Sequence, residues 1–155
     1  MIKRTGFGES HDVFSKAKRS EVMSRIRGKE NRDTELRMIE IFKAQQIHGW
    51  RRGQRVFGKP DFVFWRERIA VFVDGCFWHG CPRPKHAPLP KNRADWWAKK
   101  LAQNKMRDRL VTRTLQSRGW RVIRVWECSL TPKNLRRTAK RLKRKINRFA
   151  KLVAA

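Results

Sequence analysis

The sequence predicts an α/β domain with a central mixed β-sheet flanked by helices. Three short apolar segments between residues 54 and 73 are separated by turn residues, which indicates a β-meander. A fourth apolar segment follows a long amphipathic helix, and this order is typical of a strand that joins a sheet through a helical crossover. The 155 residues suffice for a single hydrophobic core, so we expect one main domain.

The N-terminal part is expected to be an arm followed by two helices. Residues 1–14 contain glycines and mixed charges without periodicity, so we interpret them as a flexible arm. A basic helix is predicted over Lys16–Arg27, where apolar residues recur on one side. A second helix is predicted to begin at Asp33 or Thr34, because both side chains are suitable N-caps, and to end near Gln46.

Strands are predicted at Gln54–Phe57, Asp61–Trp65 and Ile69–Val73. Glycine, proline or charged residues separate them, as in turns. The third segment is continuously apolar rather than alternating, which is typical of a strand buried on both faces. Beyond it, Cys81–Pro90 contains four prolines and is therefore expected to be an irregular loop, which a bound metal would organise.

Two helices and one strand are predicted in the C-terminal half. A helix over Arg93–Arg118 is indicated by residues spaced three and four apart: Trp97, Leu101, Asn104, Asp108, Val111 and Leu115. A strand over Trp120–Trp126 follows. Thr131 and Pro132 then suit the cap and first turn of a last helix. We expect the main domain to cover residues 15–131, and the basic helix of residues 132–155 to pack on it or extend it and to bind additional phosphates.

The charge of the chain predicts a polyanionic partner. Forty Lys and Arg residues against thirteen Asp and Glu give a formal net charge of +27, with Trp and Phe interleaved. This pattern fits nucleic acid better than a membrane surface. No apolar run approaches the roughly 20 residues that a membrane helix needs, and no secretory signal is visible. We therefore expect a soluble, cytoplasmic protein without a membrane partner, whose three cysteines suit metal binding rather than disulfides.

Two aspartates mark the ends of predicted strands. Asp61 opens one strand and Asp74 closes the next, so a hairpin would bring their carboxylates together at neighbouring strand ends. Two such carboxylates suit Mg²⁺, which usually keeps several waters and also binds substrate phosphate. Each residue alone has a simpler interpretation, because aspartate is common in turns. On a chain built to hold phosphates, we favour the metal site.

A second group of polar residues is Glu35, Asp108 and His79. Glu35 lies in the first turn of its helix, where the helix dipole alone favours an acid. Asp108 interrupts an apolar helix face, where a carboxylate is costly unless it is paired. Its partner is either a core arginine or His79. Contact with Asp108 would raise the basicity of His79, which suits a general base that activates water.

The cysteines and one histidine have the spacing of a zinc site. Cys76, Cys81 and His86 follow one another at equal intervals, and Cys128 lies downstream. Thiolates and imidazole in a set of four are what tetrahedral Zn²⁺ prefers. We favour His86 as the fourth ligand. If His79 took that place instead, it would be unavailable for catalysis.

Aromatic residues stand among the basic ones. Phe77 and Trp78 lie between two glycines in a polar loop, where they are suited to insert between base pairs. Trp97 lies on a helical stripe, for which packing in the core is the simpler interpretation. All three are candidates for contact with DNA.

Several separated motifs resemble the very short patch repair (Vsr) DNA mismatch endonucleases, a branch of the PD-(D/E)xK nuclease superfamily with a restriction-endonuclease-like fold. The resemblance covers roughly residues 16–130. Its motifs are Lys18-Arg19-Ser20, Gly58-Lys59-Pro60-Asp61-Phe62-Val63, Asp74-Gly75-Cys76-Phe77-Trp78-His79, Arg107-Asp108-Arg109 and Val125-Trp126-Glu127-Cys128.

The resemblance implies nicking of duplex DNA beside a T:G mismatch, the product of 5-methylcytosine deamination. It implies that Asp61 binds a catalytic Mg²⁺, which the main-chain carbonyl of Val73 can also reach, and that His79 is the general base. It further implies that Asp108 supports His79 and that Glu35 lies in the site. A structural Zn²⁺ is implied too.

The residues expected to contact DNA are Phe77, Trp78, Trp97, Lys18, Arg19 and Arg25.

Two other functions remain open on the sequence. One is a homing or restriction-linked endonuclease without mismatch preference, and the other is a non-catalytic basic DNA-binding protein. For the endonuclease we expect a bacterial, nucleoid-associated monomer whose partners are double-stranded DNA and other repair proteins.

Overall fold

The computed structural model describes residues 34–83 and 93–154. They form a helix over residues 34–44, strands β1 (Trp50–Arg51), β2 (Phe62–Phe64) and β3 (Ile69–Asp74), helix α2 (Ala94–Ser117), strand β4 (Arg121–Trp126), the 3₁₀ turn η2 (Glu127–Ser129) and helix α3 (Pro132–Ala154). The predicted arm and first basic helix, with Lys18, Arg19 and Arg25, lie outside the described residues. So does His86.

The four strands form one mixed sheet in the order β1-β2-β3-β4. The first three are antiparallel neighbours, and β4 pairs in parallel with β3 after the α2 crossover. The register of β3 and β4 places Phe72 opposite Arg124 and Asp74 opposite Trp126. Asp74 therefore lies at the end of the sheet to which both strands run. The predicted α/β class and the mixed sheet are confirmed.

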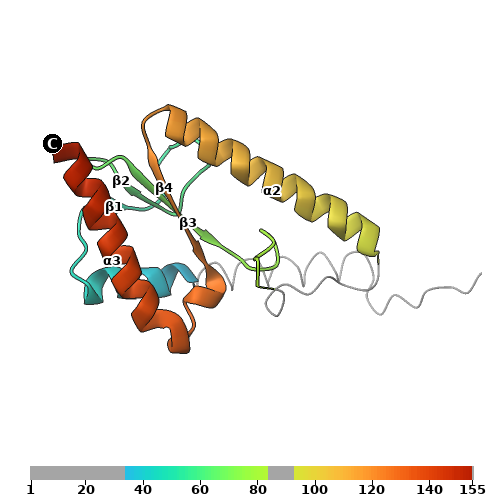
Figure 1. The fold of residues 1–155 in the computed structure, drawn as a ribbon, viewed down its shortest axis with the longest axis horizontal. Helices are drawn as coiled ribbons and strands as arrows, with labels where there is room; N and C mark the ends of the chain where they lie inside the picture. Colours follow the sequence, from blue (N-terminus) through green and yellow to red (C-terminus); the bar gives the residue numbers. More distant parts are fainter. Residues whose placement is uncertain (1–33, 84–92, 155) are drawn as a thin grey trace, which may run out of the picture.

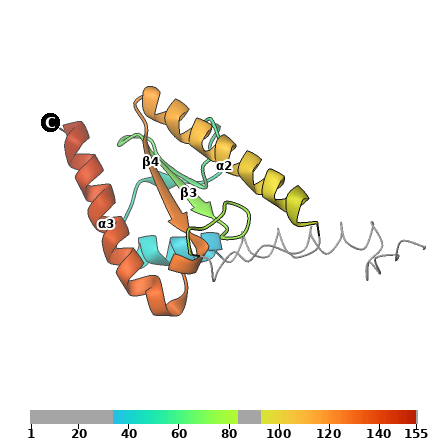
Figure 2. The same ribbon diagram turned by 45° about the vertical axis from the view of Figure 1, so that its right-hand side comes forward.

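Helices cover both faces of the sheet. Figures 1 and 2 show α2 on one side, and α3 with the helix of residues 34–44 on the other. The core under α3 is built from large apolar side chains, with Phe42, Phe62 and Leu130 fully buried. The core under α2 is smaller and contains Val63 and Leu115. Both faces of the sheet are therefore apolar, as the continuous apolar run over β3 predicts.

The spacing of apolar residues predicts α2 and α3 to within a residue or two. Leu101, Val111 and Leu115 are the buried residues of α2, and the two polar positions on that stripe are half-buried beside them. Within the described part of the chain, no helix is long and apolar enough to cross a membrane.

The prediction of a strand over Gln54–Phe57 is wrong, because the first strand is Trp50–Arg51. The main chain of the predicted segment closes on itself instead. The Val56 amide donates to the Gln54 carbonyl at 2.9 Å, and the Lys59 amide donates to the Val56 carbonyl at 2.9 Å. Gly58 brings this loop against α2, where a Cβ atom would lie 2.2 Å from a Val111 methyl group. The loop thus forms one wall of the cavity described next.

Candidate active site

A cavity of about 660 Å³ opens beside the ends of β3 and β4 and extends to α2. Its polar lining comes from segments far apart in the sequence: Asp61, Asp74, His79, Asn104, Asp108 and Arg124. Cations also line it, among them Lys59, Lys100 and Arg107. A cavity with convergent acids, one histidine and surrounding cations is suited to a phosphate group beside a metal ion.

Asp61 is held at the start of β2, facing the end of β3. Its Oδ2 accepts a hydrogen bond from the Val73 amide at 2.7 Å. The pKa of Asp61 is raised from 3.8 to about 6 by burial, and the negative charges of Glu35 and Asp74 act in the same direction, against the lowering effect of the Val73 hydrogen bond. A half-buried carboxylate with this little compensation is suited to bind a cation.

Glu35 lies close enough to Asp61 for its charge to act on that carboxyl. Glu35 also forms an ion pair with Arg52, which follows β1. The helix of residues 34–44 therefore brings one more acid toward Asp61.

Asp74, predicted as a metal ligand, is paired with an arginine. Its two carboxylate oxygens accept hydrogen bonds from Arg124, Oδ2 from Nε at 2.6 Å and Oδ1 from Nη2 at 2.7 Å. Asp74 is 2% exposed. Such a two-point pair uses the oxygens that a metal would need. In this structure, Asp74 anchors an arginine beside the cavity.

His79 and Asp108 form a close pair in the cavity. The His79 Nδ1 atom lies 2.6 Å from Asp108 Oδ2, and 3.8 Å from Asp74 Oδ1. The other Asp108 oxygen lies 3.1 Å from Arg124 Nη2. Both partners considered for Asp108 are thus present. A carboxylate at Nδ1 favours the tautomer with a proton on Nδ1, which leaves Nε2 able to accept one.

Arg124 is the central residue that sequence reasoning missed. It binds Asp74 and Asp108, its Nη1 donates to the Asp108 carbonyl at 3.4 Å, and its guanidinium lies 5.0 Å from the centre of the Phe72 ring. A sequence signal was present: Arg124 interrupts an apolar strand and shares its alternating face with Val122 and Trp126. A charge in that position needs a buried counter-charge.

The chain after β3 forms a series of turns that positions His79. The His79 amide donates to the Gly75 carbonyl at 3.1 Å, and the Cys81 amide donates to the Cys76 carbonyl at 2.9 Å. From η2, Glu127 Oε2 accepts the Cys76 amide at 3.1 Å. From α2, the Asn104 side chain donates to the Trp78 carbonyl at 2.9 Å. Asn104 thus ties the turns to the helix that supplies Asp108.

Aromatic rings gather where these turns meet the start of α2. Phe77 lies edge-on to both Trp78 and Trp97, with ring centroids 5.1 Å apart in each pair. Trp96 is edge-on to Trp97 at 4.8 Å and is 51% exposed. Trp78 also lines the cavity. The three predicted aromatic residues therefore form one cluster at its rim.

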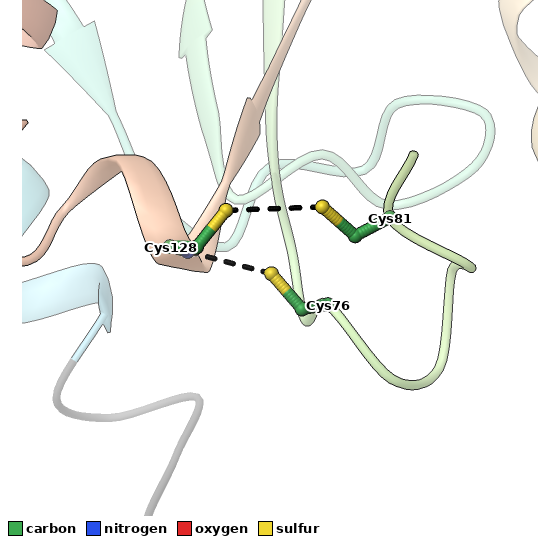
Figure 3. A group of neighbouring side chains, drawn as sticks. All are labelled: Cys76, Cys81 and Cys128. Carbon is green, nitrogen blue, oxygen red and sulfur yellow. Dashed lines mark hydrogen bonds between the residues drawn. The ribbon is translucent and has the colours of Figure 1, made fainter. Parts of the chain in front are cut away.

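Three buried cysteines form a separate group (Figure 3). Cys76 and Cys81 lie in the turns after β3, and Cys128 lies in η2. Their sulfur atoms are within 4.8 Å of one another, and the Cys81 and Cys128 sulfurs are 3.8 Å apart. No two of them form a disulfide. Burial raises the pKa of the Cys76 thiol.

The geometry of the cysteine group fits a tetrahedral metal. Thiolates at about 2.3 Å from zinc lie about 3.8 Å apart. His79 is not a member of the group, which among the described residues consists of the three cysteines alone. The cluster contains three ligands within the described residues, and the expected fourth, His86, lies outside them.

Comparison with known proteins gives consistent matches. Residues 11–83 match the family model described as DNA mismatch endonuclease Vsr. The Type II nicking enzyme V.NaeI of Lentzea aerocolonigenes is 49% identical over 77 residues, which are 50% of this chain and 45% of that protein. The chain therefore matches less than half the length of that relative.

Two other relatives are matched over most of their length. The Type II nicking enzyme V.NmeAIP of Neisseria meningitidis is 36% identical over 87% of this chain and 96% of that protein. DNA mismatch endonuclease Vsr of Escherichia coli is 38% identical over 77% of this chain and 75% of that protein. On the extent of these matches, the chain belongs to the Vsr family of DNA endonucleases.

Proposed function

We propose that this protein is a Mg²⁺-dependent endonuclease that nicks duplex DNA beside a T:G mismatch. The observation that supports it best is the shared cavity of the Asp61 carboxylate, whose pKa is raised by burial, and the His79–Asp108 pair. One group is suited to bind a metal and the other to accept a proton. Metal-assisted hydrolysis of a phosphodiester can use both.

The residues that would hold Mg²⁺ are Asp61 and, through its main-chain carbonyl, Val73. The donor set fits a hard cation, because it consists of oxygens and leaves room for water and phosphate. When bound there, Mg²⁺ neutralises charge on the phosphate undergoing attack. In this proposal Asp74 is a positioning residue, since both of its oxygens hold Arg124.

His79 would accept the proton of the attacking water at Nε2. Asp108 holds the ring through Nδ1 and stabilises the positive charge that the ring then gains. Lys59, Lys100 and Arg107 surround the cavity with positive charge that attracts the DNA backbone. Phe77, Trp78 and Trp97 would insert beside the mismatch, where unstacking costs least.

The mismatch preference is tested by nicking assays with Mg²⁺ on T:G, A:C and fully matched duplexes of one sequence. We expect nicking of the T:G duplex alone. The names of several relatives state nicking without stating a mismatch, so equal nicking of the matched duplex would favour an endonuclease without mismatch preference. If no duplex is cut, the protein is a non-catalytic DNA-binding protein.

We also propose that Cys76, Cys81 and Cys128 bind a structural Zn²⁺ with His86 as fourth ligand. Metal analysis of the purified protein should find about one zinc per chain, because a four-ligand set holds one ion. Cys128→Ser should lose the zinc and lower the melting temperature.

His79→Asn is the matched control for the zinc prediction, because it tests the competing ligand. It should keep its zinc while losing nicking. Loss of zinc from His79→Asn would make His79 a ligand and remove it as the base.

A further inference from the structure

A second polar cavity lies away from the proposed catalytic residues, where η2 and the first turns of α3 meet Arg83. Its volume is about 330 Å³, and its lining is Arg83, Ser129, Asn134, Arg137, Thr138 and Arg141. None of these residues is acidic. Three guanidinium groups from two separate segments therefore surround one small space.

Within the described residues, none of the three arginines forms an ion pair with a carboxylate. Arg83 donates to Cys128 Sγ at 2.8 Å and lies 3.5 Å from Ser129 Oγ. Arg137 and Arg141 are exposed and one helical turn apart, a spacing at which like charges repel. An anion in the cavity would relieve this repulsion.

The polar wall of the cavity is fixed by hydrogen bonds between η2 and α3. Thr138 and Ser129 are both buried, and Thr138 Oγ1 donates to the Ser129 carbonyl at 2.8 Å. The Asn134 side chain donates to the Cys128 carbonyl at 2.9 Å. These bonds fix the part of α3 that contains Arg137 and Arg141, so less protein conformational entropy is lost when an anion binds there.

The cavity lies at the same end of the sheet as the proposed active site. Asp74 pairs with Trp126 at the end of β4, and η2 follows directly with Ser129. Figures 1 and 2 show the turn from β4 into α3 at the end toward which β3 and β4 point. The active-site cavity extends to α2, whereas this cavity lies on the α3 side.

Positive charge continues from the cavity along α3. This helix contains ten Lys and Arg residues and no acid, and Lys140, Arg144 and Arg148 are exposed on successive turns. Burial and the charge of Arg141 lower the pKa of Lys145. The cations of α3 therefore act on one another.

We propose that the cavity of Arg83, Arg137 and Arg141 binds a backbone phosphate of the duplex that flanks the nicked site. Guanidinium groups match phosphate oxygens in two-point hydrogen bonds, and the Ser129 hydroxyl is a further donor. The inference rests on the proposed function, because it takes duplex DNA as the substrate. The contact would hold the flanking duplex while the catalytic cavity holds the scissile phosphate.

The test is the salt dependence of duplex binding by R137Q/R141Q, measured by fluorescence anisotropy without added Mg²⁺. Each phosphate contact contributes about 0.9 to the slope of log affinity against log salt. We expect the slope to fall by about 1 and the affinity at 0.1 M salt to fall roughly tenfold. K133Q/R136Q is the matched control, since it removes two exposed charges from the same helix outside this cavity.

A slope change no larger than that of K133Q/R136Q would overturn the inference. Inorganic phosphate alone distinguishes a free anion from the DNA backbone. If it raises the melting temperature of the unaltered protein but not of R137Q/R141Q, while the DNA slopes agree, the cavity binds a free anion and the proposal is wrong. Nicking tests the proposed function separately: absent nicking with the expected slope change would overturn that function alone.

Discussion

Asp61→Asn is expected to abolish nicking while duplex binding persists. Asparagine keeps the shape of the side chain and can still accept the Val73 amide, but it lacks the charge that would hold Mg²⁺. We expect the single-turnover rate on a T:G duplex to fall by roughly a thousandfold or more, equivalent to about 4 kcal/mol of transition-state stabilisation. Affinity for the same duplex without Mg²⁺ should stay within about twofold, because one charge changes among many phosphate contacts.

The same variant has a stability signature that depends on pH. The pKa of Asp61 is about 6 in the folded protein, against 3.8 for an aspartate side chain that is fully exposed to water. Ionising Asp61 therefore destabilises the folded state, by an amount that is absent below pH 3.8, grows up to pH 6 and is constant above it. Without added Mg²⁺, Asp61→Asn should melt at a higher temperature than the unaltered protein at about pH 8, and the difference should shrink toward about pH 4.

Glu40→Gln is the control for both measurements, because it removes an exposed carboxylate from the helix of residues 34–44. It should nick normally and show no such pH trend. If Asp61→Asn retains nicking, Asp61 does not hold the metal. If Asp61→Asn is no more stable than the unaltered protein at a pH above about 6, the ionised Asp61 carboxylate does not destabilise the folded protein.

The elements with strong periodicity were predictable from sequence. The stripe on α2 places Asn104 and Asp108 on the face that meets the sheet, because residues three and four apart share one side of a helix. That spacing alone indicated that Asp108 needs a partner. The continuous apolar run of β3 likewise predicted a buried strand that ends at Asp74.

Local patterns could not predict which groups meet across the sheet. Arg124 reaches Asp74 because the parallel register of β3 and β4 places Phe72 opposite Arg124, and a register is set by the whole fold. For the same reason, Asp74 was assigned to a metal on the sequence but is paired with an arginine in the structure. A strand was expected over Gln54–Phe57 because residues of these types favour strands. The prediction failed because the main chain of this segment forms local hydrogen bonds in turns instead of pairing with a neighbouring strand.

Arg124→Met should be among the most destabilising single changes in the chain. Methionine preserves much of the packing against Phe72 but leaves Asp74, 2% exposed, and Asp108 without their cation. Removing one partner of a buried ion pair costs about 3–5 kcal/mol. We expect the free energy of unfolding in urea to fall by about 3 kcal/mol, since Arg124 retains some contact with solvent. Nicking should fall as well, because His79 depends on Asp108 for its orientation.

A double variant separates the stability lost with the ion pair from the stability lost with packing. If the cost of Arg124→Met is the unpaired Asp74 carboxylate, then adding Asp74→Asn should restore part of the stability, since the pair is removed from both sides. Arg121→Met is the matched control: it lies on the same strand, with its guanidinium 5.9 Å from the Phe149 ring and no carboxylate partner among the described residues. It should cost about 1 kcal/mol or less. A double variant no more stable than Arg124→Met would mean that Arg124 stabilises the fold through packing rather than through its ion pair with Asp74.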